Sequence, residues 1–252
     1  MNQLLGLIGY PLTHSFSKAY FTQKFETEGI SGYEYELFPI ERIEKLPALL
    51  NENHRLVGLN VTIPYKVAVM PYLKQLDETA TAIGAVNTIK IHRGHSSGDP
   101  FLSGFNTDAW GFRESLRPLL RPWHNKALIL GTGGASKAIR YVLQNLGIEF
   151  LSVSRTPAEE QVSYRELNPE LMQEYPLIVN TTPLGTFPDT AQCPDIPYEA
   201  LSERNLLYDL VYNPPETLFL KKGREKGSAI VNGMEMLRLQ AEKAWEIWTE
   251  KV

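Results

Sequence analysis

The stretch KALILGTGGASKAIRYVLQNLG, residues 126–147, decides the fold of this chain. It begins with an apolar run at residues 126–130, which predicts a buried strand, and continues into the glycine-rich turn GTGGAS at residues 131–136. A helix is expected over residues 136–146, with Gly147 beyond its end. Strand, glycine turn and helix in this order form the context in which a dinucleotide phosphate binds at a helix N-terminus.

Each glycine of this turn has its own predicted function. Gly131 permits the tight turn, and Gly133 lets the backbone approach the phosphates. Ser136 occupies the third glycine position of the GxGxxG fingerprint, so the motif is imperfect and an ordinary strand–helix turn remains an alternative.

The end of the next strand, predicted at residues 150–154, favours NADP over NAD. An NAD site would place Asp or Glu there to bind the ribose 2′-hydroxyl, whereas this chain has Ser154, Arg155 and Thr156. A guanidinium with a hydroxyl suits a 2′-phosphate. A solvated loop arginine is the alternative, and the nearby carboxylates of Glu159 and Glu160 would weaken phosphate binding if they turned inward.

Strands and helices alternate on both sides of this stretch, which is the pattern of an α/β protein with a mostly parallel sheet. Further strands are predicted at residues 4–8, 33–38, 56–62, 85–91, 177–180, 206–210 and 230–231. Further helices are predicted from Ser17, as a cap, to Gly29, and at residues 42–52, 79–83, 107–120 and 234–248. A turn at residues 92–100 makes residues 101–104 a hairpin partner. The terminal helix is expected to pack back on the first domain.

Composition excludes several classes of protein. The 252 residues suffice for one or two domains, and Pro118 and Pro122 mark a junction nearby. A net charge of −4 argues against a nucleic-acid surface, and no apolar run is long enough to cross a membrane. Cys193 is the single cysteine, so no internal disulfide forms, which fits a reducing cytoplasm. The N-terminus lacks the basic region of a signal peptide, and the histidines show no metal spacing.

Two polar loops, GLNVTIPYK at residues 58–66 and GFNTDAWG at residues 104–111, precede the dinucleotide turn. Lys66 and Asp108 are candidates for the proton transfer that accompanies hydride transfer between an alcohol and nicotinamide. The alternatives are a solvated surface charge for Lys66 and a helix cap for Asp108. An acid/base pair ahead of a dinucleotide site indicates a dehydrogenase that needs no metal.

The sequence resembles the shikimate dehydrogenase family over nearly its whole length. The matching segments follow the family's order: GYPLTHSFS (9–17), GLNVTIPYK, GAVNT (84–88), GFNTDAWG, GTGGASKA (131–138), SRT (154–156), NTTPLG (180–185), YDLVYNPPET (208–217) and NGMEMLRLQA (232–241).

This resemblance implies a substrate-binding catalytic domain at residues 1–105 plus 235–252, and a Rossmann-like NADP-binding domain at residues 106–234. It implies reversible NADP-dependent reduction of 3-dehydroshikimate to shikimate by a cytoplasmic monomer or homodimer. The catalytic pair would be Lys66 and Asp108. The implied substrate ligands are these two with Ser15, Ser17, Asn60, Thr62, Asn87, Tyr212 and Gln240, and the implied cofactor contacts are Gly131, Gly133, Gly134, Ala135, Ser154, Arg155, Thr156, Leu210 and Gly233.

The chain departs from the family pattern in three places. Lys18, Phe21 and Thr22 replace a proline and a histidine–asparagine pair, Glu159 replaces a second arginine, and Thr186 replaces a methionine. The Glu159 replacement predicts weaker NADP affinity with some tolerance of NAD. Two other functions stay open: an NAD-using quinate/shikimate dehydrogenase, and a nucleotide-binding sensor that has lost catalysis.

Overall fold

The computed structural model describes residues 2–12, 15–93 and 100–250 of the chain. The chain folds into two compact units. The first unit comprises Met1–Thr107 with Ala241–Val252, and the second comprises Asp108–Gln240. The first unit is therefore built from both ends of the chain, whereas the second is one continuous stretch.

A six-stranded mixed sheet forms the centre of the first unit, in the order β2-β1-β3-β5-β6-β4. Its strands are β1 (Gln3–Gly9), β2 (Tyr33–Pro39), β3 (Leu56–Val61), β4 (Gln75–Leu76), β5 (Thr88–His92) and β6 (Phe101–Phe105). Strand β5 pairs antiparallel with β3 and β6, and the other three pairings are parallel. The predicted hairpin is confirmed as β5–β6, although residues 94–99 of its predicted turn lie outside the described residues.

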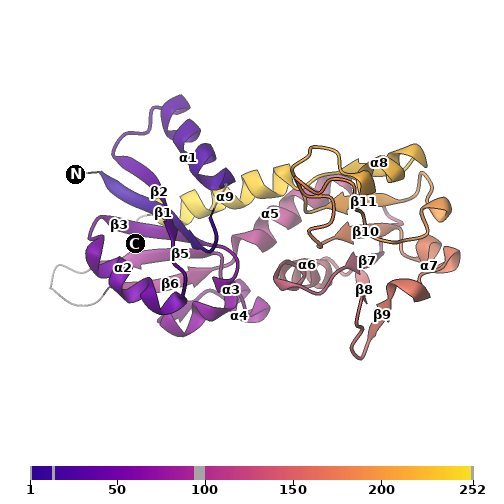
Figure 1. Cartoon of the computed structure of the whole chain (residues 1–252), viewed down its shortest axis with the longest axis horizontal. Helices are drawn as coiled ribbons and strands as arrows, with labels where there is room; N and C mark the ends of the chain where they lie inside the picture. The colour runs from indigo at the N-terminus through magenta and orange to yellow at the C-terminus, as the bar shows by residue number, and fades with distance from the viewer. Residues whose placement is uncertain (1, 13–14, 94–99, 251–252) are drawn as a thin grey trace. The chain divides into compact units, whose positions relative to one another are not determined.

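Strand β1 is apolar after Gln3 because both faces of the sheet are covered. Successive side chains of a strand point to opposite faces, so Leu4 and Ile8 join one core while Leu5 and Leu7 join the other. The first core includes residues of α2 (Leu46–Glu52), α3 (Tyr65–Ala68) and α4 (Glu78–Ile83), and the second includes residues of α1 (Phe16–Thr27) and of the end of α9 (Met234–Thr249). Figure 1 shows α1 beside β1 and β2.

Helix α1 begins one residue after Ser15, which is its N-cap. Ser15 has the extended backbone of a cap (φ −129°, ψ 117°), and its side chain accepts a hydrogen bond from the backbone N–H of Lys18. The prediction that Ser17 caps this helix is therefore wrong. Ser17 lies inside the first turn, so its hydroxyl is not used as the cap.

An all-parallel, six-stranded sheet forms the centre of the second unit, in the order β12-β11-β10-β7-β8-β9. Its strands are β7 (Lys126–Leu130), β8 (Glu149–Ser154), β9 (Gln161–Ser163), β10 (Leu177–Asn180), β11 (Leu206–Asp209) and β12 (Ala229–Val231). This is the strand order of dinucleotide-binding domains, in which the order reverses between the first and fourth strands, here β7 and β10. A ligand crevice is expected there, outside the carboxyl ends of the strands.

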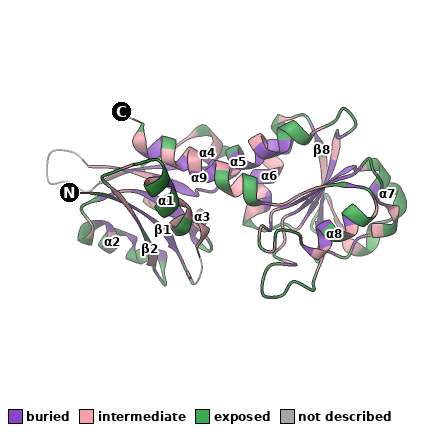
Figure 2. Cartoon of the chain, turned by 90° about the horizontal axis from the view of Figure 1, so that it is seen from above, coloured by how far each residue is buried: buried purple, intermediate pink, exposed green. Residues whose placement is uncertain are grey.

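Buried side chains fill both faces of this second sheet, and Figure 2 shows its strands largely in the colour of buried residues. The helices of the unit are α5 (Thr107–Leu116), α6 (Gly134–Asn145), α7 (Pro169–Glu174), α8 (Leu218–Glu225) and the first part of α9. Helix α5 packs so closely on α9 that a Cβ at Gly111 would collide with the Met236 carbonyl. Tyr208 of β11 hydrogen-bonds to Ser115 of α5 at 2.6 Å.

The last turns of α9 belong to the first unit, which confirms that the terminal helix packs back on the first part of the chain. The Trp248 indole N–H donates to the Ile89 carbonyl at 2.9 Å. Its ring lies where a Cβ on Gly58 would be, so only glycine at this position of β3 leaves room for the indole.

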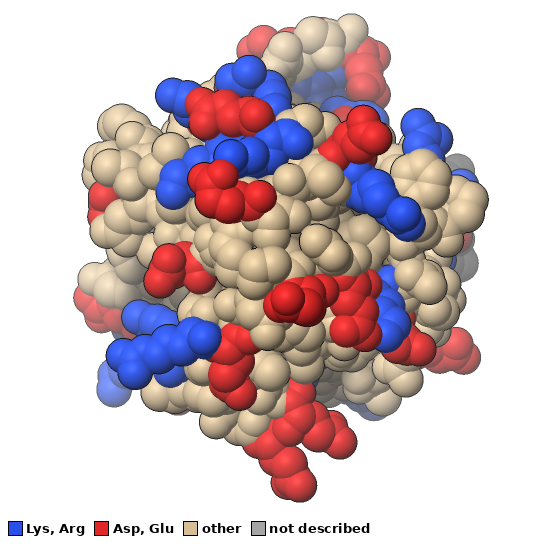
Figure 3. All heavy atoms as spheres, turned by 90° about the vertical axis from the view of Figure 1, so that its right-hand side faces the viewer, with Lys and Arg blue, Asp and Glu red and all other residues tan. Residues whose placement is uncertain are grey.

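The surface and composition of the described residues add three observations. Acidic and basic side chains are interspersed on the face shown in Figure 3. No helix in the described ranges is long and apolar enough to cross a membrane. Among the same residues, no group of three or more His, Cys, Asp and Glu side chains is placed to hold a metal ion.

Candidate active site

The glycine-rich turn lies where the strand order of the second unit reverses. Gly131 follows β7 directly with a φ of 103°, a conformation that favours glycine. A Cβ at Gly131 would also lie 2.9 Å from Thr181 Oγ1 and Thr182 Cγ2, just beyond the end of β10. Both the backbone angle and the close contact therefore require glycine at the first position of the motif.

The other glycines of the turn leave open space at the start of α6. Gly133 is the N-cap of this twelve-residue helix, and a Cβ on Gly133 or Gly134 would meet no protein atom within 4 Å. The first N–H groups of α6, which include that of Ala135, lack partners inside the helix and carry its positive dipole end. This arrangement suits the pyrophosphate of NADP.

Ser136, at the third glycine position of the motif, is accommodated within the turn. Its side chain is 1% exposed, and its hydroxyl donates to the Gly133 carbonyl at 2.7 Å. The hydroxyl thus folds back on the turn instead of separating α6 from the sheet, and the turn keeps its shape.

The end of β8 holds the three residues predicted to select NADP. Thr156 N–H donates to the Ser154 hydroxyl at 3.3 Å, and that hydroxyl donates to the Thr156 carbonyl at 3.2 Å. This small turn exposes Arg155 between them. The ion pairs of the described residues include none between Arg155 and Glu159 or Glu160.

Leu210 and Gly233, two predicted cofactor contacts, touch each other beyond the ends of β11 and β12. A Cβ on Gly233 would collide with the Leu210 carbonyl, and the Gly233 N–H donates to the Val211 carbonyl at 3.1 Å. Glycine at 233 is therefore required by close approach of two backbones.

Asp209 organises the same edge of the sheet, and its side chain is fully buried. One carboxylate oxygen accepts from Asn180 Nδ2 at 2.9 Å and from the Val211 N–H at 3.0 Å. The other accepts from the Thr217 hydroxyl at 2.6 Å. Burial raises the pKa of Asp209 to about 6, and the three hydrogen bonds oppose this shift.

The buried network around Asp209 extends to the loop after β10. Asn180 Oδ1 accepts from the Thr182 N–H at 3.0 Å and from the Thr182 hydroxyl at 2.7 Å. Thr217 is the N-cap of α8. Three chain segments at the carboxyl edge of the sheet are thus joined through one carboxylate, which we call the Asp209 network.

A second buried network lies in the first unit and contains two predicted substrate ligands, Asn60 and Asn87. Asn60 Nδ2 donates to Thr88 Oγ1 at 3.3 Å and to the Asn87 carbonyl at 3.4 Å. Asn87 Oδ1 accepts from the Thr107 N–H at 2.7 Å, and Asn87 Nδ2 donates to the Thr107 hydroxyl at 2.9 Å. We call these four residues, with Tyr35, the Asn60 network.

Lys66 is held next to this network by its backbone. It lies in the short helix α3, half-buried, and its carbonyl accepts a 2.7 Å hydrogen bond from the Val86 N–H, one residue before Asn87. Thr62 is half-buried, and its N–H donates to the Ile8 carbonyl at 3.0 Å. The first unit thus contains Lys66 and five of the predicted substrate ligands: Ser15, Ser17, Asn60, Thr62 and Asn87.

The remaining predicted ligands belong to the second unit. Asp108 is half-buried in the first turn of α5 and follows Thr107 of the Asn60 network directly in the chain. Tyr212 is half-buried in the loop after β11. Gln240 is buried on α9, and its side-chain amide donates to the Leu237 carbonyl at 2.9 Å.

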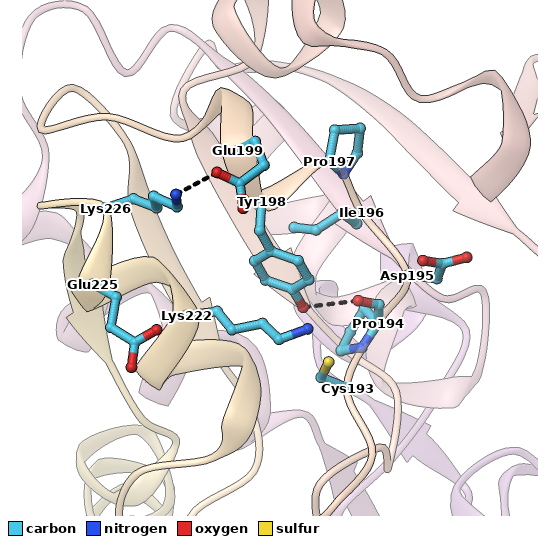
Figure 4. Close-up of a pocket in the computed structure, with 10 residues that line it drawn as sticks. All are labelled: Cys193, Pro194, Asp195, Ile196, Pro197, Tyr198, Glu199, Lys222, Glu225 and Lys226. Atoms are coloured by element: carbon cyan, nitrogen blue, oxygen red, sulfur yellow. Dashed lines mark hydrogen bonds and ion pairs between the residues drawn. The ribbon is translucent and has the colours of Figure 1, made fainter.

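A pocket of about 580 Å³ beside α8 is lined by none of the predicted site residues (Figure 4). Lys222 reaches over the ring of Tyr198, with Nζ 4.4 Å from the ring centroid, while Lys226 forms an ion pair with Glu199. Two lysines face three carboxylates around this pocket, so its charge favours neither an anion nor a cation. We assign it no function.

Sequence reasoning missed the residues that hold the site residues in place. Tyr35, Thr88 and Thr107 support the predicted ligands, and Asp209 with Asn180 supports the loops that carry predicted cofactor contacts. The only sequence feature that could have indicated them is that they are polar residues inside or next to apolar strands. Their hydrogen-bond partners could not be identified because most of these lie far away in the chain.

The chain is similar to known proteins over nearly its whole length. Residues 7–89 match the family described as "Shikimate dehydrogenase substrate binding domain". The chain is 35% identical to a shikimate dehydrogenase (NADP(+)) of Methanococcus maripaludis over 266 residues, covering 99% of this chain and 92% of that protein.

The whole fold is shared with solved structures of other proteins. The shikimate 5-dehydrogenase of Thermus thermophilus, in complex with NADP(H) and shikimate, has a TM-score of 0.81 and 35% identity, covering 98% of this chain and 93% of the other. The quinate dehydrogenase of Corynebacterium glutamicum, in complex with NAD, has a TM-score of 0.84 and 27% identity, covering 98% and 94%. The combined fold, glycine turn and full-length identity show that this chain belongs to the shikimate dehydrogenase (NADP(+)) family.

Proposed function

We propose that this protein catalyses the reversible reduction of 3-dehydroshikimate to shikimate with NADPH, a step of aromatic amino acid biosynthesis. The proposal rests on two features that occur together in this chain. The first unit contains a buried set of amides and hydroxyls, and the second contains an open glycine turn. The first suits a polyol, and the second suits a dinucleotide.

The first unit is the substrate-binding domain in this proposal, and the second is the NADP-binding domain. Ser15, Ser17 and Tyr212 supply hydroxyls for the shikimate carboxylate, while Asn60, Asn87 and Gln240 supply amides that both donate and accept. Thr62 adds a further hydroxyl. The protein acts in the cytoplasm as a monomer or homodimer, which light scattering of the purified protein at micromolar concentration would test.

The cofactor binds across the carboxyl edge of the second sheet. Gly131, Gly133, Gly134 and Ala135 hold its pyrophosphate, while Ser154, Arg155 and Thr156 hold the 2′-phosphate. Leu210 and Gly233 line the edge beyond β11. Bound NADPH supplies the hydride that the reduction requires.

Lys66 and Asp108 carry out the proton transfer. Reduction of the ketone adds a hydride to carbon and a proton to oxygen, and Lys66 donates that proton. In the reverse direction, Lys66 accepts the proton from the shikimate hydroxyl. Asp108 accepts a hydrogen bond from the same hydroxyl and keeps the oxygen and Lys66 oriented.

The assay that tests this function follows NADPH absorbance with purified protein, shikimate and NADP⁺. Replacement of Lys66 by Ala should lower kcat by about a hundredfold or more, the usual scale for a general acid/base. The matched control is Lys45→Ala, which removes an exposed lysine of the same unit. Unchanged turnover in the Lys66→Ala protein would rule out its proton-transfer role.

A broader dehydrogenase that accepts quinate or NAD is the second candidate. It is favoured by Glu159, which places a carboxylate four residues after Arg155, and by the similarity to an NAD-bound quinate dehydrogenase. The same assay with quinate and with NAD⁺ separates the two candidates. A strong preference for shikimate and NADP⁺ supports the first, and comparable kcat/KM for quinate or NAD⁺ supports the second.

A further inference from the structure

One buried hydroxyl, that of Tyr35, holds a predicted substrate ligand, Asn60, that lies on another strand. Tyr35 lies on β2 with 4% of its surface exposed. Its hydroxyl donates to Asn60 Oδ1 on β3 at 2.7 Å. The side chain of Ser17, in the first turn of α1, lies close enough to the same hydroxyl to favour its ionised form, which opposes the effect of burial on the pKa of Tyr35.

The ring that carries this hydroxyl is firmly packed. Phe21 stacks on it, with ring centroids 4.8 Å apart and planes at 16°. Trp248 packs at 6.4 Å from its centroid. Because aromatic side chains have few rotatable bonds and this one is enclosed, its hydroxyl has a fixed position. Phe21 thus takes part in fixing Tyr35.

The partners of Asn60 determine how its amide is oriented. Asn60 Nδ2 faces the Asn87 carbonyl, which can only accept a hydrogen bond. Oδ1 must therefore face Tyr35, and Tyr35 must be the donor. Burial raises the pKa of Tyr35 far above its usual value, so the phenol keeps the proton that it donates.

We propose that Tyr35 is a positioning residue for shikimate, which fixes the side chain of Asn60 from behind through its hydroxyl. This inference rests on the proposed function and deepens it. With Nδ2 committed to Thr88 and Asn87, Asn60 keeps one free lone pair on Oδ1. Asn60 then recognises a substrate group that donates a hydrogen bond, namely a hydroxyl of the ring.

The Tyr35→Phe variant tests the proposal, because it removes the hydroxyl and keeps the ring. Loss of one buried hydrogen bond that orients a ligand should raise both the Kd and the KM for shikimate about tenfold. The KM for NADP⁺ should stay within about twofold of wild type, since the contacts of Tyr35 lie in the first unit. Calorimetry gives Kd and the absorbance assay gives KM.

Tyr208→Phe is the matched control. Tyr208, like Tyr35, is a buried tyrosine whose hydroxyl forms a hydrogen bond to a side chain, here that of Ser115. It lies in the second unit. Both variants should lose similar thermal stability, whereas only Tyr35→Phe should weaken shikimate binding. Equal effects of the two variants on shikimate affinity would show that general destabilisation is responsible and would overturn the proposal.

A double-mutant cycle makes the test specific. Tyr35→Phe combined with Asn60→Ala should weaken shikimate binding by clearly less than the product of the two single effects, because both remove the same interaction. Multiplicative effects would overturn the positioning role.

The binding and turnover measurements also separate this inference from the proposed function. Shikimate binding without turnover by the wild-type protein would refute the proposed function, while the Kd values would still decide the role of Tyr35. Absence of both binding and turnover would overturn both proposals.

Discussion

The two units each contain a buried polar network, but the chemistry of the networks differs. The Asn60 network consists of amides and hydroxyls, all neutral at every physiological pH. The Asp209 network is built on a carboxyl group. Hydrogen bonds to a carboxylate are stronger than neutral ones, but a buried charge costs free energy, which is why the pKa of Asp209 is raised. The Asn60 network therefore does not depend on pH, whereas the Asp209 network does.

The largest expected effect comes from removing the carboxyl group. Asp209→Ala leaves Asn180 Nδ2, the Thr217 hydroxyl and the Val211 N–H without their acceptor. Each buried, unsatisfied donor costs about 1–3 kcal/mol, so the free energy of unfolding should fall by about 3 kcal/mol or more. Urea denaturation at pH 7 measures this loss. The control is Asp195→Ala at an exposed site, which should stay within about 0.5 kcal/mol of wild type.

The pH dependence of stability provides the second test. The folded-state pKa of Asp209, about 6, lies above its ordinary value of 3.8, so the folded protein holds the proton more tightly than the unfolded chain. The stability that this group contributes is complete below about pH 4 and is lost as pH rises through about 6. The loss amounts to about 3 kcal/mol.

Asp209→Asn lacks this titration and should show a correspondingly flatter stability profile. Denaturation of both proteins between pH 4 and pH 7 gives the difference, in which the other carboxyl groups cancel. Parallel profiles for the two proteins would mean that Asp209 does not titrate in this range.

The smallest effect is expected in the neutral network. Thr88→Val keeps the shape of the side chain but removes a hydroxyl that contacts Asn60 Nδ2 at 3.3 Å and Thr107 Oγ1 at 3.2 Å. The free energy of unfolding should fall by about 1–2 kcal/mol, equally at pH 4 and pH 7. Thr88→Ser retains the hydroxyl and serves as the control. A loss that changes with pH would contradict the distinction between the networks.

Most of the second unit was predictable because its strands are buried on both faces. Strands β7 and β10 were predicted with their observed bounds, since each is a short apolar run ending at polar or glycine residues. Strands β4 and β9 were missed because two or three residues at the edge of a sheet carry no periodic signal. Helix α8 was missed because it contains Gly223, where Leu207 packs against the helix.

The predicted start of β5 at residue 85 was three residues early. The apolar residues there suggested a strand, but the Val86 N–H donates to the Lys66 carbonyl instead of a sheet partner. Local sequence could not reveal that long-range bond.

The candidate site also contains residues that the sequence could predict and residues that it could not. Its ligands were recognisable as polar residues in motifs, and the glycine turn was recognisable by its context. The supporting residues were not, because Tyr35 and Asn60 are 25 positions apart and Asn180 and Asp209 are 29 apart. Lys66 and Asp108, assigned to different units, stay predictions as a catalytic pair.

The position of Trp248 has a consequence for synthesis on the ribosome. The core that contains Phe21 and Tyr35 also contains Ala241, Ala244 and Trp248, which are translated long after these two aromatic residues. The continuous second unit can complete its core as soon as Gln240 has left the exit tunnel. The segment that contains Phe21 and Tyr35 must wait for α9, so the nascent first unit exposes an aromatic surface until that helix has emerged.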